Sequence, residues 1–315
     1  MSLIFWIIIF AISLFILTKS SDYFIESAEI TGWRLKIPKF VIGATIVALG
    51  TSLPELISSV IAVIQNASEI VAGNVIGSNI TNILLILGVS GFAFKEMDIN
   101  TKIIKIDLPI LLISALLLVI TIIDGEFSLS EGLIFILFLI FYILYIFNSK
   151  SNLPLSTEST ENIDQFTWKT IITLIGSTIF IFLGAKYTID SVINIAEILN
   201  IGKEIIAITA ISLGTSLPEL IVSLSAVKKN NPEMVLGNIL GSNIFNTLAV
   251  MSIPALFGKL TIPESIIFYA LPIMCLTSLI LLLISLDKKI SKNESILLIV
   301  FYFIFIAGLF FNLKT

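Results

Sequence analysis

The sequence of 315 residues contains no histidine, a single cysteine and few charged residues, which make up 13% of the chain. The absence of histidine removes the imidazole ring as a metal ligand and as a proton relay. Cys275 has no second cysteine to pair with, so an intramolecular disulfide is impossible, and its apolar surroundings indicate core packing. The net charge of −4 is too small to favour nucleic acid as a partner, and we expect none.

Several short motifs that would indicate enzymatic chemistry are also missing. The sequence has no phosphate-binding loop, no EF-hand loop and no Gly-x-Ser-x-Gly nucleophile elbow. We therefore expect a protein that is not an enzyme and that holds no cofactor. Without a phosphate-binding loop, any transport that it performs would have to be driven by an ion gradient.

Hydrophobic residues, in contrast, make up 57% of the chain, which indicates a membrane protein with many spans. Because the backbone must satisfy its own hydrogen bonds in lipid, and because the apolar runs are too long for barrel strands, we expect an all-α protein. Residues 3–17 favour a first span over a removed signal peptide. The apolar runs predict ten transmembrane helices, at residues 3–28, 40–65, 70–94, 107–124, 130–148, 168–198, 204–227, 233–257, 264–286 and 294–311.

One hexapeptide, Gly-Thr-Ser-Leu-Pro-Glu, occurs twice. It covers residues 50–55 and returns 164 residues later at 214–219. The glycine, serine and asparagine residues within 73–82 recur within 237–246 at the same separation of 164 residues. The two halves therefore align without a gap across two predicted helices. With five helices in each half, the second half must enter the membrane from the opposite side. This is the inverted-repeat arrangement of many secondary transporters, whose substrate site lies near the midplane.

The longest polar stretch, residues 149–166, divides the chain. We interpret it as a linker between a first five-helix repeat at 1–148 and a second, inverted repeat at 167–315. The loops that alternate along the chain carry thirteen basic residues in one set and three in the other. The positive-inside rule therefore places the linker in the cytoplasm and both termini outside the cell membrane.

Each copy of the hexapeptide places a carboxylate inside an apolar run, where a charge is costly and marks a functional site by default. Thr51 and Glu55 are four residues apart and share one helical face. Pro54 lacks an N–H and crowds the carbonyl of Gly50, which frees backbone oxygens to line a cavity or bind an ion. We therefore expect Glu55 and Glu219 to face each other and to hold a cation.

Short polar side chains on neighbouring helices would complete this site. All the candidate donors are oxygens, which favours Ca²⁺, Mg²⁺ or Na⁺ over Zn²⁺ or Cu⁺. The two carboxylates would repel each other without a cation, so replacement of one ion by another is easy to picture. Helix packing is the alternative role for the serines of the second motif, and interhelical hydrogen bonding is the alternative for its asparagines. The candidate side chains are Glu55, Glu219, Thr51, Thr215, Ser52, Ser216, Ser78, Ser242, Asn82 and Asn246.

At these residues the chain resembles the cation/calcium exchanger superfamily, and within it the Na⁺/Ca²⁺ exchanger branch with its prokaryotic members. The H⁺/Ca²⁺ branch usually carries a Gly-Asn-x-x-Glu type motif in place of this hexapeptide. The resemblance implies that Glu55 and Glu219 bind Ca²⁺ and share it with Na⁺, and that the backbone carbonyls of Ala48 and Ser212 help to coordinate Na⁺. It also implies contributions from the hydroxyl groups of Thr51, Thr215, Ser52, Ser216, Ser78 and Ser242.

The resemblance further implies that the first and sixth helices slide past the others to alternate access. Asparagine at both 82 and 246 argues against K⁺ co-transport, because an aspartate accompanies K⁺ dependence in one branch. The expected activity is exchange of Na⁺ for Ca²⁺ across a lipid bilayer, by a protein for which a monomer is plausible. Two alternatives stay open: a proton-coupled antiporter for Ca²⁺ or another divalent cation such as Mn²⁺, and a cation channel.

Overall fold

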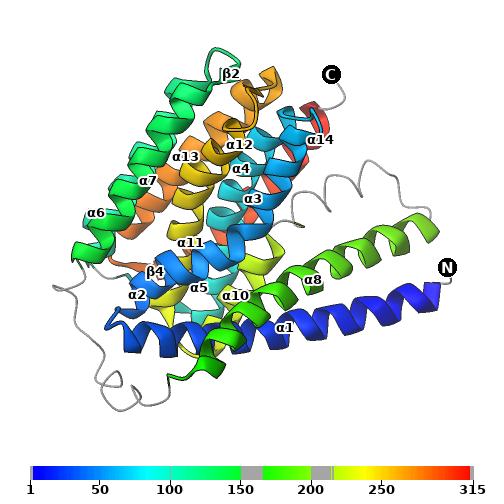
Figure 1. Cartoon of the computed structure of the whole chain (residues 1–315), viewed down its shortest axis with the longest axis vertical. Helices are drawn as coiled ribbons and strands as arrows, with labels where there is room; N and C mark the ends of the chain where they lie inside the picture. The colour runs from blue at the N-terminus through cyan, green and yellow to red at the C-terminus, as the bar shows by residue number, and fades with distance from the viewer. Residues whose placement is uncertain (1–2, 100, 150–165, 200–213, 215, 313–315) are drawn as a thin grey trace.

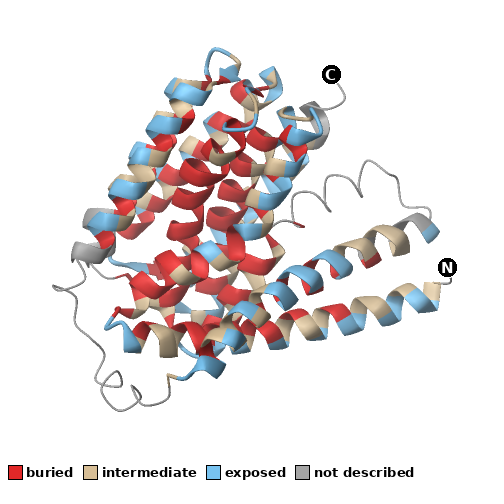
Figure 2. Cartoon of the chain, viewed as in Figure 1, coloured by how far each residue is buried: buried red, intermediate tan, exposed pale blue. Residues whose placement is uncertain are grey.

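The computed structural model of the protein describes residues 3–99, 101–149, 166–199, 214 and 216–312. Within this part of the chain, eight helical runs are long and apolar enough to cross a membrane. The long helices expose apolar side chains on their outer faces, as a lipid-facing surface requires (Figures 1 and 2). The protein is a multi-pass membrane protein with an α-helical fold, as the composition predicts.

The helices follow the predicted apolar runs, with short π-helical turns, labelled η, set into several of them. The first part of the chain contains α1 (Leu3–Arg34), α2 (Lys39–Ile42), η1 (Gly43–Val47), α3 (Ala48–Ile64), α4 (Glu69–Thr81), η2 (Asn82–Leu87), α5 (Gly88–Phe94), β1 (Glu96–Asp98), α6 (Thr101–Ile122), β2 (Glu126–Phe127) and α7 (Leu129–Ser149). The second part contains α8 (Trp168–Ile198), α10 (Leu217–Lys228), α11 (Pro232–Phe245), η6 (Asn246–Val250), α12 (Ser252–Ala255), β3 (Leu260–Thr261), η7 (Ile266–Ala270), α13 (Leu271–Ser285), β4 (Lys289–Ser291) and α14 (Lys292–Asn312).

Some predicted boundaries need correction or lie outside the described residues. The helix predicted at 3–28 continues to Arg34, because Gly32 is accommodated within it and the first proline, Pro38, lies beyond the turn that follows. Of the helix predicted at 204–227, the structure describes Gly214 and the residues from 216 onward, and α10 begins at Leu217. Residues 150–165, which make up nearly all of the predicted linker, also lie outside the described part.

Two short antiparallel ladders join loops of the first half to loops of the second, which the all-α prediction did not include. Strand β1 pairs with β4, where Met97 lies opposite Ile290, and β2 pairs with β3, where Phe127 lies opposite Leu260. All four of these side chains are buried. Strands β2 and β4 lie at opposite ends of the helical bundle (Figure 1). The ladders therefore connect the two halves at both ends.

Helix α11 and the π-helical turn η1 pack backbone against backbone in the centre of the bundle. A Cβ atom added to Gly43 would lie 2.6 Å from the carbonyl oxygen of Met234, and one added to Gly241 would lie 2.6 Å from Ala44 Cα. Gly237 also faces η1. The small-xxx-small spacing of Gly237 and Gly241 thus lets two backbones approach closely. Every residue from Met234 to Ser252 is buried as a result (Figure 2).

Helices α1 and α8 form an antiparallel pair along one side of the bundle (Figure 1). Gly184 of α8 lies against the backbone of Leu17, and the Thr188 hydroxyl donates a hydrogen bond to Ser13 Oγ over 3.0 Å. The outer faces of both helices are largely exposed (Figure 2). Their inner faces cover the helices that carry the repeated hexapeptide.

Candidate cation site

Two carboxylates from different halves of the chain are buried in the centre of the protein. Glu55 on α3 and Glu219 on α10 are each 1% exposed. Ser52, one helical turn before Glu55, donates a hydrogen bond to Glu219 Oε1 over 3.1 Å, so α3 and α10 meet at this point. The structure thus brings Ser52, Glu55 and Glu219 together, as the sequence predicts.

These carboxylates have few hydrogen-bond partners. Both oxygens of Glu55, and Oε2 of Glu219, are buried without a donor among the described residues. A buried carboxylate without compensation costs several kcal/mol, because its hydration is lost and nothing replaces it. The donor set therefore fits a positively charged guest with a preference for oxygen ligands.

The first hexapeptide lies within α3, and its glycine contacts helix α1. Pro54 stands inside this helix, where it has no N–H to offer to the carbonyl of Gly50. A Cβ atom added to Gly50 would lie 2.5 Å from Phe24 Cζ of α1, so only glycine fits there without displacement of Phe24. In the second copy, Pro218 lies in the first turn of α10, a position that proline tolerates well.

Thr51 connects α3 to α11. Its hydroxyl oxygen is 3.3 Å from both the Ala48 carbonyl oxygen and Asn238 Oδ1, and 3.5 Å from Ser242 Oγ. Asn238 is in turn held by Ser223, whose hydroxyl oxygen accepts from Asn238 Nδ2 over 3.0 Å. Thr51, Ala48 and Ser242, all predicted site residues, therefore lie together.

The hydrogen bond between Asn238 and Ser223 has a counterpart in the first half. Asn74 Nδ2 donates to Ser59 Oγ over 3.2 Å, and both residues precede their counterparts by 164 positions. None of the four residues in these two hydrogen bonds is among the predicted site residues. The repeat itself was the signal that could have found them, because Ser59 and Asn74 recur at the offset of the hexapeptide.

Asn82 and Asn246 each begin a π-helical turn, η2 and η6. Asn82 Nδ2 donates to Asn243 Oδ1 over 2.9 Å, whereas its own Oδ1 has no partner among the described residues. Both side-chain polar atoms of Asn246 are buried without a partner in that same part of the chain. Interhelical hydrogen bonding thus accounts for the nitrogen of Asn82, and the amide oxygens of Asn82 and Asn246 are available as ligands.

The remaining candidates divide into two groups. Ser78, on α4, and Ser216, just before α10, are buried, and the Ser216 hydroxyl has no partner in the described part of the chain. Ser212 and Thr215 lie outside the described residues. Among the described residues, no group of three or more His, Cys, Asp or Glu side chains that could hold a metal ion occurs. A cation at this site would therefore need neutral oxygen ligands beside the two carboxylates.

Comparisons with known proteins decide the family. The family model described as "Sodium/calcium exchanger protein" matches residues 5–148 and 169–311. The chain belongs to the sodium/calcium exchanger family. This family consists of transporters rather than enzymes, and the family predicted from the hexapeptides is confirmed.

Individual relatives match over nearly the whole length of this family member. The sodium/calcium exchanger MaX1 of Methanosarcina acetivorans is 36% identical over 96% of this chain and 98% of its own. The putative antiporter CaxA of Alkalimonas amylolytica is 31% identical over 91% and 93%. A solved structure of the sodium-calcium exchanger NCX_Mj, soaked with Na⁺ and Sr²⁺, has a TM-score of 0.83 at 32% identity, and the match covers 97% of this chain and 99% of that one.

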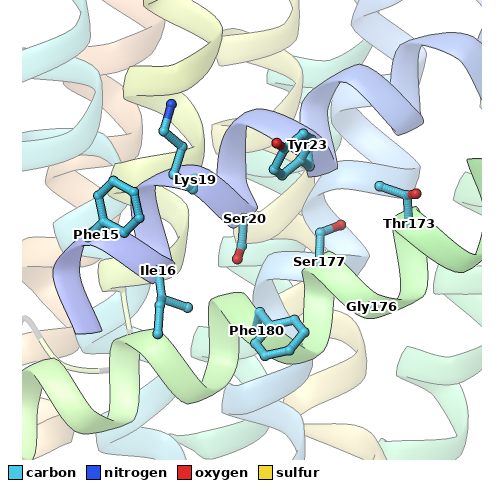
Figure 3. A pocket seen from close by; sticks show the side chains of 9 residues that line it. All are labelled: Phe15, Ile16, Lys19, Ser20, Tyr23, Thr173, Gly176, Ser177 and Phe180. Carbon is cyan, nitrogen blue, oxygen red and sulfur yellow. The ribbon is translucent and has the colours of Figure 1, made fainter. Parts of the chain in front are cut away.

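A groove on the outer side of this exchanger-family fold is separate from the buried carboxylates. It lies between α1 and α8, has a volume of about 410 Å³ and is lined mainly by apolar atoms, including the rings of Phe15 and Phe180 (Figure 3). Ser20 and Ser177 point toward one another across it, whereas Lys19 points away from α8. None of the predicted cation ligands lines this groove. The carboxylate site itself is closed to the outside, because Glu55 and Glu219 are almost fully buried.

Proposed function

We propose that the protein is a secondary-active antiporter that exchanges Na⁺ for Ca²⁺ across the cell membrane. The observation that carries the proposal is the pair of buried carboxylates, Glu55 and Glu219, with three of their four oxygens unpartnered among the described residues. One Ca²⁺ balances both charges, and Na⁺ ions can do the same in its place. The cost of leaving the site empty then couples the release of one ion to the binding of another, and the Na⁺ gradient drives the exchange. Two proteins that match this chain over nearly their whole length are named sodium/calcium exchangers.

The proposed ligands are all oxygens, contributed by both halves. Ca²⁺ accepts about six to eight oxygen ligands in flexible geometry, which this set can supply. Asparagine at both 82 and 246, rather than a carboxylate, leaves two negative charges at the site, and we propose no K⁺ co-transport. The proposed ligands are the side chains of Glu55, Glu219, Thr51, Thr215, Ser52, Ser216, Ser78, Ser242, Asn82 and Asn246, with the backbone carbonyls of Ala48 and Ser212.

We propose ten spans in two inverted five-helix repeats, at 1–148 and 167–315, joined by a cytoplasmic linker at 149–166, with both termini outside. The two segments matched by the family model support this division. The ladders support the inversion. At an offset of 164 residues β1 corresponds to β3 and β2 to β4, yet β1 pairs with β4 and β2 pairs with β3. An operation that places the first half on the second therefore places each ladder on the other one. Because the two ladders lie at opposite ends of the bundle, this operation turns the bundle end over end, as an inverted repeat requires.

The proposed alternation of access involves α1 and α8. Phe24 of α1 covers Gly50 at the start of the first hexapeptide, and Ile189 of α8 lies 3.0 Å from a Cβ atom added to Gly214 at the start of the second. Each of the two helices thus covers one copy of the motif. Displacement of the pair along the bundle would uncover the carboxylates on one side of the membrane and then on the other.

The test is uptake of Ca²⁺ by vesicles that contain the purified protein and an imposed Na⁺ gradient. We expect Na⁺-dependent uptake by the wild type and a loss of at least about tenfold in Glu55→Gln and in Glu219→Gln, because each removes one of the two charges that bind the ion. Glu264→Gln is the control, since Glu264 is an exposed carboxylate in the helical turn just before η7. Undiminished uptake by the variant with both substitutions would reject the proposal.

The same vesicles distinguish the alternatives. A proton-coupled antiporter would take up Ca²⁺ under a pH gradient without Na⁺, a function that the family comparisons do not favour. A channel would pass current far above the turnover of an exchanger. Competition by Mn²⁺ in the Na⁺-driven assay measures how strongly the site prefers Ca²⁺.

A further inference from the structure

Four asparagine side chains form a network where α4 meets α11, beside the carboxylate site. Asn79 and Asn82 from the first half meet Asn243 and Asn246 from the second, and the two pairs are related by the 164-residue offset. Asn82 Nδ2 donates to Asn243 Oδ1 over 2.9 Å, and Asn243 Nδ2 donates to the carbonyl oxygen of Asn79 over 3.2 Å. All four side chains are at most 3% exposed. Such a buried network fixes each amide that has a partner.

The network does not follow the twofold symmetry of the sequence repeat. The counterpart of the bond from Asn82 to Asn243 would join Asn246 Nδ2 to Asn79 Oδ1. Both of these atoms lack a hydrogen-bond partner among the described residues. One asparagine of the proposed cation site, Asn82, is therefore held in place, whereas the other, Asn246, is not.

The halves differ at one residue that contacts this network. Asn79 Nδ2 donates to Thr247 Oγ1 over 2.8 Å, and its other neighbour, Met274 Sδ, is a weak acceptor 3.8 Å away. The residue that corresponds to Thr247 in the first half is Ile83, which has no hydroxyl group. The amide nitrogen of Asn79 is thus directed to Thr247, and Asn79 Oδ1 accepts no hydrogen bond from Asn246.

We propose that Thr247 is a positioning residue that holds the Asn79 amide and thereby keeps Asn246 free to adapt to the bound ion. The inference rests on the proposed function, because it assumes that Asn82 and Asn246 supply ligands. Asn82 offers an oxygen in one fixed orientation, and Asn246 offers one that can turn. Burial of an amide with both polar atoms unpaired is costly, which is consistent with a ligand that acquires its partners only with the ion.

An adaptable oxygen matters more for Ca²⁺ than for Na⁺, because Ca²⁺ takes more ligands in variable geometry. Without the Thr247 hydroxyl, the Asn79 amide is released and can pair with Asn246 as Asn243 pairs with Asn82. Asn246 would then be held in one orientation. The apparent KM for Ca²⁺ should rise, while the Na⁺ concentration that gives half-maximal exchange should change less.

The experiment compares Thr247→Val with Thr247→Ser in Na⁺-driven Ca²⁺ uptake by vesicles. Valine has the shape of threonine without the hydroxyl group, whereas serine keeps it. We expect valine to raise the apparent KM for Ca²⁺ by about threefold or more, in the range of coupling between contacting residues, and serine to stay within about twofold of the wild type. If the valine variant does not fold, Thr247→Ala takes its place. A KM unchanged in the hydroxyl-free variant would overturn the inference.

A second comparison tests whether Thr247 acts through Asn79. In a chain that already carries Asn79→Ala, no amide is present to pair with Asn246, so Thr247→Val should have little further effect on the KM for Ca²⁺. An equal rise in both backgrounds would assign Thr247 a merely structural role and overturn the inference. Absence of Na⁺-driven uptake by the wild type would instead refute the proposed function.

Discussion

Substitution of Gly241 by alanine tests the contact that holds α11 against η1. The added Cβ atom would lie 2.6 Å from Ala44 Cα and 2.8 Å from the Ala44 carbonyl carbon, whereas ordinary contacts are 3.4–4 Å. These are backbone atoms, so no side chain can rotate out of the way. The variant therefore either folds with the two helical segments separated by roughly 1 Å more than in the wild type, or fails to fold.

The separation should affect both stability and ion binding. Overpacking of this kind costs about 1–3 kcal/mol of unfolding free energy. Thr51 is already 3.3 Å from Asn238 Oδ1 and 3.5 Å from Ser242 Oγ, so a shift of that size would break both contacts. Each lost hydrogen bond adds about 0.5–1.5 kcal/mol. Because Thr51 is a proposed ligand, we also expect the apparent KM for Ca²⁺ to rise.

The assay is thermal unfolding of the detergent-purified protein, followed by Na⁺-driven Ca²⁺ uptake in vesicles. The matched control is Gly176→Ala on α8, because no described atom lies within 4 Å of its added Cβ and the residue faces the groove of Figure 3. We expect the control to be as stable as the wild type or slightly more stable, since alanine favours a helix over glycine. If the Gly241→Ala and Gly176→Ala variants have the same Tm and the same Ca²⁺ uptake, α11 and η1 do not make the close backbone contact described above.

Two further substitutions test contacts away from the carboxylates. Tyr142→Phe removes the hydroxyl group that donates to the buried Asp107 Oδ1 over 3.4 Å, and we expect it to lower the unfolding free energy by about 1–3 kcal/mol; a Tm equal to that of the wild type would contradict this. In the wild type, the hydrogen bond from Lys289 to Glu96 raises the pKa of Lys289. This pair therefore stabilises the fold at pH values below the ordinary lysine pKa, and the stabilisation is lost as the pH rises through the raised pKa. Glu96→Gln removes the carboxylate and with it this pH-dependent stabilisation. We expect the small difference in Tm from the wild type to shrink in high salt and to vanish in strongly alkaline buffer, and a difference that persists there would refute the ion-pair account.

The sequence alone predicts much of this architecture because the membrane restricts the choices. Apolar runs in lipid must be helical, and a repeated polar hexapeptide within such runs directs attention to Glu55 and Glu219. The meeting of Ser52 with Glu219 follows from the same reasoning, since two related helices that both carry carboxylates must share one polar interior. Family membership was also predictable, because the specific letters at 50–55 and 214–219 carry it.

Other features were out of reach because they depend on tertiary contacts. The π-helical turns that begin at Asn82 and Asn246 change the hydrogen-bond register, which no local sequence pattern reports. Strands of two or three residues, such as β2, are too short to show alternation. The difference between Thr247 and Ile83 is visible in the sequence, but its effect depends on where the amide of Asn79 points.

The ladders between β1 and β4 and between β2 and β3 have a consequence for biosynthesis. Glu96 and Lys289, whose side chains form a hydrogen bond across the first ladder, are 193 positions apart in the sequence. When the ribosome has made the first five helices, three elements still lack their partners: β1, β2 and η1, whose Gly43 packs against α11. Contacts of such long range form slowly, so the nascent protein must remain in the membrane with unsatisfied edges until its last helices arrive. The candidate residues of the carboxylate site, the last of which is Asn246, are therefore all made before β4 can close the ladder with β1.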